Sequence, residues 1–244
     1  MKRSLLKNIL SVLVRFGVTV FAFWWIFRKI DGAALRGILG SLSIPWIIAS
    51  ILFYLMTQAG CIFRWGLLAP RHPALKWTFL ANSYLVAAFF NMFLPTTVGG
   101  DVIRGYDLIK KTGEWKSSLA SVLADRLAGF VGFFLFALAA WIVFPAARQD
   151  PLVRAAFGGF AALVAVTFGV LGSRRAVQWM LTPFSKIGLG QLQSHARQFQ
   201  EALQTYLGRP QLLMQVMAAS AFIQTCVILM FWAAGRALHR GQAD

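Results

Sequence analysis

Residues 91–104 read Asn-Met-Phe-Leu-Pro-Thr-Thr-Val-Gly-Gly-Asp-Val-Ile-Arg, and this stretch decides how the chain is built. Pro95 ends a helix, because proline lacks a backbone N–H and clashes with the preceding turn. Gly99 and Gly100 permit backbone angles closed to other residues and let a ligand or another helix approach closely. Asp101 predicts the N-cap of a second, short helix. We therefore expect a broken helix whose second half begins here.

The start of this second helix favours a bound anion. Its first turn offers free backbone N–H groups, the positive end of the helix dipole and Arg104, and a lipid phosphate is an anion of the right kind. An ordinary loop followed by a capped helix explains the same residues about equally well. Two features favour a cavity: apolar residues lead into charged ones, as in the discontinuous helices of transporters, and the next apolar span carries the charged pair Asp125-Arg126.

The composition indicates an integral membrane protein. The 244 residues are 58% hydrophobic and only 13% charged, with 22 Phe and 9 Trp that a soluble core of this size cannot all bury. This excludes a soluble enzyme, a disordered chain and a disulfide scaffold. The net charge of +16 is explained by loops that set topology and meet anionic lipid headgroups, so no nucleic-acid partner is expected.

Five stretches are long and apolar enough to cross a bilayer of about 30 Å. They lie at about 9–27, 44–63, 119–144, 152–172 and 212–234. Together they predict an all-α, polytopic membrane helix bundle forming a single transmembrane domain over residues 1–244.

A sixth apolar segment, 77–94, either crosses the membrane or enters and returns. A re-entrant segment over about 77–111, with a cytoplasmic N-terminus, places about two thirds of the loop Lys and Arg residues inside, whereas a full crossing divides them almost evenly. We therefore expect a re-entrant broken helix. Such a helix is compatible with a truncated inverted-repeat fold. Irregular backbone at membrane depth needs protein or water around it, so a cavity around 91–104 should open to the cytoplasmic side.

The polar connection before the last span carries apolar residues at helical spacing. Residues 191–207 therefore predict an amphipathic helix in the cytoplasmic interface, and a solvated connector packed on the bundle fits equally well.

The pair Asp125-Arg126 lies inside an apolar span, where charges are costly. Adjacent residues point about 100° apart on a helix, so these two cannot simply neutralise each other. We expect them to pair with the broken helix, as Asp125 with Arg104 or as Arg126 with Asp101. The alternative is that they only anchor the span near the cytoplasmic headgroup boundary.

Other chemistry is not indicated. The three histidines are scattered, no spacing resembles a metal site, and no nucleophile elbow or phosphate-binding loop occurs. We expect no metal, no cofactor and no enzymatic activity. Gln58, Ser220 and Gln224 either line the cavity or form hydrogen bonds between helices.

A motif in this region resembles that of a known family. It consists of Asn91, Leu94-Pro95, Gly99-Gly100-Asp101 and Arg104, followed by Ser121-Val122-Leu123, Asp125-Arg126 and Gly129. These residues resemble the membrane region of lysylphosphatidylglycerol synthases and their stand-alone, flippase-like relatives. The resemblance implies proteins that bind or translocate aminoacylated or glycosylated lipids, with paired re-entrant segments around a central cavity.

The sequence departs from that family in two ways. It has no soluble aminoacyl-transfer domain, so lipid aminoacylation is not expected. The family's second motif, P-x-x-x-G-x-G-x-x-E, does not occur before Asp244, so we expect half of a two-repeat path.

The resulting expectation is a flippase-like, multi-pass protein of a bacterial or archaeal-type cell (inner) membrane. It would bind an anionic phospholipid or a polyprenyl-phosphate-linked headgroup in a cytoplasm-facing cavity and assist its translocation. The alternative is a non-catalytic scaffold or accessory subunit of a lipid-modifying or glycosyl-transferring membrane enzyme. The expected substrate-binding residues are Asn91 and Arg104 at the headgroup, Gly99 and Gly100 at the close approach, Asp101, Asp125 and Arg126 in a supporting ion network, and Pro95 at the helix break.

Overall fold

The computed structural model describes residues 40–93, 98–173 and 208–238, together with Tyr206 and single positions between residues 17 and 37. Within these residues the chain is helical and contains no strand, which confirms an all-α, polytopic membrane helix bundle. The expected span at 9–27 and the expected amphipathic helix at 191–207 lie outside the described residues, apart from single positions.

Four of the described helices are long and apolar enough to cross a membrane. They are α3 (Ile44–Leu68), α6 (Trp115–Val143), α8 (Pro151–Gly172) and α11 (Pro210–Leu238). The 29 residues of α6 and of α11 make each helix about 43 Å long at 1.5 Å per residue. Each therefore exceeds a hydrocarbon core of about 30 Å, which leaves room for polar ends.

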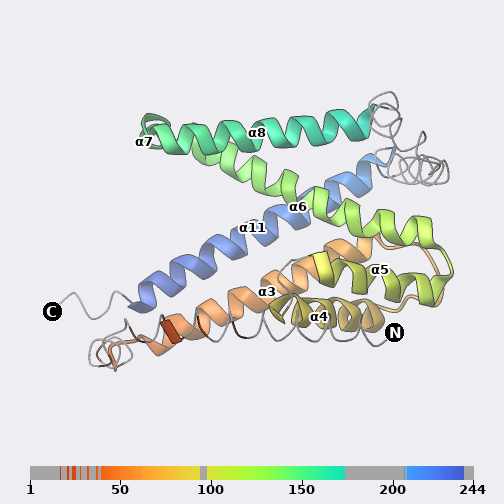
Figure 1. The fold of residues 1–244 in the computed structure, drawn as a ribbon, viewed down its shortest axis with the longest axis horizontal. Helices are drawn as coiled ribbons and strands as arrows, with labels where there is room; N and C mark the ends of the chain where they lie inside the picture. The colour runs from red at the N-terminus through yellow and green to blue at the C-terminus, as the bar shows by residue number, and fades with distance from the viewer. Residues whose placement is uncertain are drawn as a thin grey trace. The chain divides into compact units, whose positions relative to one another are not determined.

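The segment with the Gly-Gly pair forms two helices that pack side by side, α4 (Trp77–Phe93) and α5 (Val98–Thr112) (Figure 1). The expected interruption thus lies at residues 94–97, which are outside the described part of the chain. Asp101 is not an N-cap as expected, because α5 already begins at Val98 and places Asp101 in its first turn. The re-entrant path of this hairpin through a membrane stays a prediction.

A second hairpin joins α6 to α8 through the short helix α7 (Pro145–Gln149) (Figure 1). Side chains in the connection satisfy backbone groups at both helix ends. Arg148 donates to the carbonyls of Trp141 and Ile142 at 2.7 and 2.6 Å. The Oδ1 atom of Asp150 accepts two N–H groups of the first turn of α8 at 2.7 and 3.2 Å, and so caps that helix.

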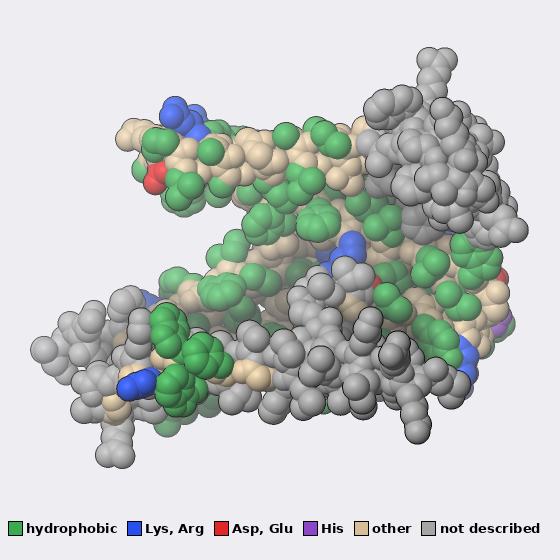
Figure 2. Space-filling model, viewed as in Figure 1, with side chains coloured by type: hydrophobic (Ala, Val, Ile, Leu, Met, Phe, Trp, Pro, Cys, Tyr) green, Lys and Arg blue, Asp and Glu red, His purple; other side chains and the backbone are tan. Residues whose placement is uncertain are grey.

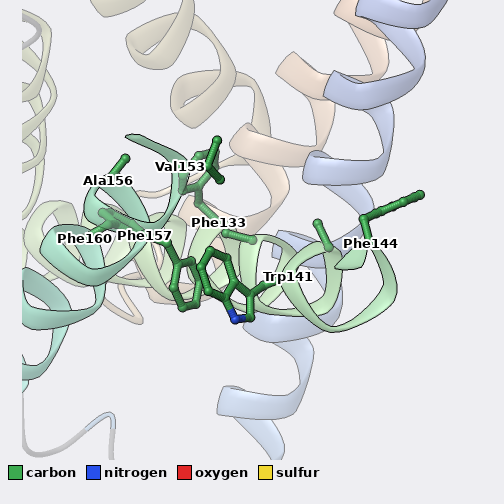
Figure 3. Close-up of a pocket in the computed structure, with 9 residues that line it drawn as sticks. Phe133, Trp141, Phe144, Val153, Ala156, Phe157 and Phe160 are labelled. Atoms are coloured by element: carbon green, nitrogen blue, oxygen red, sulfur yellow. The ribbon is translucent and has the colours of Figure 1, made fainter. Parts of the chain in front are cut away.

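Aromatic side chains fill the space between α6 and α8. Trp141 stacks on Phe157 with ring centroids 4.5 Å apart, and Phe133 meets Phe160 edge-on at 5.3 Å. Together they border a cavity of about 430 Å³ that is lined by apolar side chains (Figure 3). Figure 2 shows hydrophobic side chains in patches along α8 and over the adjoining part of α6. We call this region the aromatic hollow.

The chain divides into two compact units, Met1–Ile51 with Met230–Asp244, and Leu52–Leu229. In the first unit the start of α3 meets the end of α11. The N–H of Ser43 donates to the carbonyl of Ala237 at 3.1 Å. The rings of Trp46 and Trp232 lie edge to face with centroids 5.0 Å apart, and Arg236 lies over both rings at 5.9 and 5.6 Å.

In the second unit small residues let α11 approach its neighbours closely. A Cβ atom on Gly132 of α6 would lie 2.7 Å from the Cβ of Ser220, and one on Gly60 of α3 would lie 2.8 Å from Ile223. Such contacts are typical of membrane helices, which associate through close packing and hydrogen bonds rather than through the hydrophobic effect.

Candidate functional site

Arg64 of α3 forms the first part of a buried ion network. Its Nε donates to Asp125 Oδ1 of α6 at 2.8 Å, and its Nη1 donates to Ser220 Oγ of α11 at 3.1 Å. The hydroxyl of Ser220 in turn donates to the carbonyl of Ala128 at 3.3 Å. One guanidinium therefore ties three candidate membrane spans together.

Arg104 of α5 lies at the centre of the network. Its Nη1 donates to Asp125 Oδ2 at 3.1 Å and its Nη2 to Asp101 Oδ1 at 2.6 Å. The guanidinium carbon lies 4.9 Å from the ring centroids of both Trp65 and Tyr84. Only 4% of the side chain is exposed, so Arg104 is enclosed by two carboxylates and by the rings of Trp65 and Tyr84.

Arg126 of α6 is the last member of the network and its most exposed side chain. Its Nε and Nη2 donate to the two oxygens of Asp101 at 2.6 and 3.0 Å, a bidentate arrangement. The side chain of Arg126 is 39% exposed, against 18% for Asp101 and 4% for Asp125. Arg126 is thus the network member with the greatest access to its surroundings.

The ion network, defined as Arg64, Asp125, Arg104, Asp101 and Arg126, carries more positive than negative charge. Each aspartate bridges two arginines, so three guanidiniums share two carboxylates. Taking charges out of water costs several kcal/mol per ion even when they are paired. Charged groups inside membrane helices mark functional sites by default, and an excess of one guanidinium over the carboxylates among the described network residues favours an anion as the ligand.

Both expected pairings are present, Asp125 with Arg104 and Arg126 with Asp101. Arg64 is not among the expected site residues, because the second span was expected to end at residue 63, whereas α3 runs on to Leu68. Trp65 follows it and is also absent from the expected set, although its ring is fully buried against Arg104. The sequence signal that could have identified both residues is a basic and an aromatic side chain, Arg64 and Trp65, directly after the apolar stretch 44–63.

The Asn91 and Gly100 side of the motif holds α4 against α5. Asn91 Oδ1 accepts the N–H of Gly100 at 2.8 Å. A Cβ on Gly100 would lie 2.6 Å from the carbonyl oxygen of Ala87 and from the Asn91 amide. The close approach expected at this glycine is therefore made by a helix. Gly99 is half-buried, and Pro95 lies outside the described residues.

Two further polar contacts complete the picture. Ser83 of α4 donates to Asp107 of α5 at 2.7 Å, a second tie across the hairpin. Gln58 bonds to Tyr54 on its own helix at 3.0 Å, whereas Ser220 joins the network as described above. Over the part of the chain that the structure describes, His, Cys, Asp and Glu form no group of three or more that could hold a metal ion.

The Trp65 ring leaves a donor unsatisfied next to the network. Its Nε1 is buried and has no hydrogen-bond partner among the described residues. A buried donor without an acceptor costs about 1–3 kcal/mol, so such groups call for an explanation.

Comparison with known proteins gives one match. The family model for the lysylphosphatidylglycerol synthase TM region matches residues 12–240, and so covers most of the chain. No curated protein and no solved structure matches.

Proposed function

The chain belongs to the family of the lysylphosphatidylglycerol synthase TM region, and we propose that it binds an anionic lipid headgroup at the ion network and assists the translocation of that lipid. The headgroup is that of a phospholipid or of a polyprenyl-phosphate-linked lipid. One observation carries the proposal: three guanidiniums share two carboxylates inside a bundle of apolar helices. A phosphate would supply the missing negative charge.

Arg126 is the residue that we assign to the headgroup. It is the most exposed member of the network, and Asp101 holds its guanidinium in place through two hydrogen bonds. Arg104 was the expected contact, but only 4% of its side chain is exposed, and it is already bonded to Asp101 and Asp125 and lies over two aromatic rings. We therefore assign Arg104 the role of holding the network together.

The Trp65 indole supports the same site. Its N–H is buried and lacks an acceptor among the described residues, while its ring lies against Arg104. A headgroup oxygen that reached this N–H would recover the free energy lost by burying it. The variant Trp65→Phe removes that donor, along with part of a fully buried ring, and should weaken lipid binding by about three- to tenfold.

Access from the cytoplasmic side follows from the expected topology. Arg71, Lys76, Lys110, Lys111 and Lys116 flank α4, α5 and the start of α6. By the positive-inside rule these residues favour a cytoplasmic location for this end of the bundle. The α4–α5 hairpin would then enter the membrane from that side and present the network there.

Translocation is tested in vesicles that contain phosphatidylglycerol with a fluorescent headgroup. The fraction of label reached by an impermeant quencher is followed over time for the wild type, for Arg126→Gln and for the control Arg154→Gln. Arg154 is an exposed arginine of α8 outside the network, so its variant loses the same charge.

We expect the wild type to speed translocation over empty vesicles. Arg126→Gln should lose at least about tenfold in rate, equivalent to 1.4 kcal/mol, because the remaining two arginines and two aspartates are electrically balanced. Arg154→Gln should match the wild type. Equal rates for wild-type and empty vesicles would contradict translocation and favour a scaffold that partners a membrane enzyme.

A further inference from the structure

A second cavity lies apart from the ion network, where three candidate spans end. It measures about 600 Å³ and is bordered by the end of α3, the start of α6 and the start of α11. None of the five network residues lines it. The charged and polar side chains in its wall include Arg71, Arg209, Ser117, Gln211 and Gln215. We call it the end cavity.

Among the described residues that line the end cavity, no carboxylate compensates the two arginines. Their guanidiniums form no ion pair with any residue that the structure describes. Ser117 from the lining does contact an acidic residue, since its hydroxyl donates to Glu114 Oε2 at 2.7 Å. Two cations near one carboxylate leave the wall with a net positive charge, which favours an anion.

The wall is also partly apolar, as a lipid site requires. Leu67 of α3 and Leu212 of α11 lie beside the polar side chains. Tyr206 closes the wall, because its hydroxyl donates to the carbonyl of Leu68 at 2.9 Å. Burial raises the pKa of Tyr206 to about 12 although Arg209 acts in the opposite direction. The phenol therefore stays neutral at physiological pH and adds no negative charge.

The position along the helices matches the level of lipid headgroups. Leu68 ends α3, Trp115 begins α6 and Pro210 begins α11. Span ends of this kind lie where phosphates of anionic lipids meet basic side chains. We propose that the end cavity binds the phosphate group of an anionic headgroup, independently of the ion network and of any translocation.

The test counts tightly bound lipids by native mass spectrometry of the full chain, titrated with phosphatidylglycerol or with phosphatidylcholine of the same acyl chains. The key variant is Arg71→Gln/Arg209→Gln. Its control is Lys110→Gln/Arg154→Gln, which loses the same charge at exposed positions outside both sites. Arg126→Gln reports on the ion network alone, so the two proposals can fail separately.

If both proposals hold, the wild type and the control each retain two phosphatidylglycerol molecules, and Arg71→Gln/Arg209→Gln and Arg126→Gln each retain one. A count of one in the wild type that falls to zero only in Arg71→Gln/Arg209→Gln supports the end cavity and contradicts the network site. A count that Arg71→Gln/Arg209→Gln leaves unchanged from the wild type overturns the end-cavity proposal. Equal retention of phosphatidylcholine overturns it as well.

Two further measurements sharpen the result. Glu114→Gln removes the carboxylate next to Ser117 and should tighten phosphatidylglycerol binding by about three- to tenfold. This gain keeps the proposal testable if the double variant does not fold, and its absence would count against the site. Competition with excess inorganic phosphate distinguishes the two sources of the anion. A lipid that stays bound supports a site for a lipid headgroup. A lipid that free phosphate displaces indicates a site for inorganic phosphate instead.

Discussion

The two halves of α6 lie against entirely different surroundings. The first half buries Ser118, Ser121 and Asp125 and contributes Arg126 to the ion network. The second half contributes Phe133 and Trp141 to the aromatic hollow, and several of its large apolar side chains are exposed. The helix is long and apolar enough to cross a membrane, but length and hydropathy alone do not explain where the bundle packs tightly.

The contrast teaches which interactions organise a membrane bundle. Lipid chains are as apolar as leucine, so an aromatic side chain gains little by moving from lipid into protein. A charged side chain gains much, because an uncompensated charge in lipid is expensive. The ion network should therefore dominate the stability of the bundle, and the aromatic hollow should contribute little.

The largest effect is expected from Asp125→Asn. This change leaves Arg64 and Arg104 without a shared carboxylate while both remain buried, and breaking a buried pair costs about 3–5 kcal/mol. Unfolding in mixed micelles measures the loss. The control Asp150→Asn should be nearly silent, since asparagine caps a helix as well as aspartate does. Equal losses of unfolding free energy for Asp125→Asn and Asp150→Asn would show that the ion network does not dominate the stability of the bundle.

The next effect is expected from Gly100→Ala. The added Cβ would lie 2.6 Å from the backbone oxygen of Ala87, and backbone cannot yield cheaply, so we expect a loss of about 1–3 kcal/mol. Gly159→Ala makes the same change on α8, where nothing lies within 4 Å. It should be neutral or stabilise by up to about 1 kcal/mol. Thermal unfolding of both variants checks the difference.

A smaller effect is expected for the exposed end of the network. A double-mutant cycle with Asp101→Asn and Arg126→Gln should give a coupling of about 1 kcal/mol, within the range of about 0.5–3 kcal/mol for residues in contact. Arg126 is partly exposed, so its pair is worth less than the fully buried ones. Additive effects, measured by unfolding, would show that the bidentate contact contributes nothing.

The smallest effect is expected in the aromatic hollow. Trp141→Leu removes the stack on Phe157, and such aromatic pairs contribute about 0.5–1.5 kcal/mol beyond their buried area. We expect a loss of about 1 kcal/mol or less, with the number of bound lipids unchanged. A loss as large as that of Asp125→Asn would mean that aromatic packing also organises the bundle.

Much of this arrangement could be predicted from the sequence. A break after α4 follows from Pro95, although Gly99 and Gly100 lie within α5. The cross-helix pairing of Asp125 and Arg126 follows from the cost of charge inside an apolar span. Charges that cannot neutralise each other within one helix must find partners on another.

Other features could not be predicted, for physical reasons. The partners of Arg64 could not be read from its own segment, because Asp125 and Ser220 lie on helices distant in sequence. The role of Gly132 could not be predicted either, because the residue that approaches it closely, Ser220, lies far away in sequence. The end cavity likewise joins side chains from three separate helices.

The central claim is that the excess positive charge of the ion network holds a headgroup. The most direct test is untargeted mass spectrometry of the lipids that copurify with the wild type, with Arg126→Gln and with Arg154→Gln, each checked for monodispersity. We expect one anionic lipid species that is enriched with the wild type and with Arg154→Gln and reduced with Arg126→Gln. The same lipids in equal amounts in all three samples would contradict it.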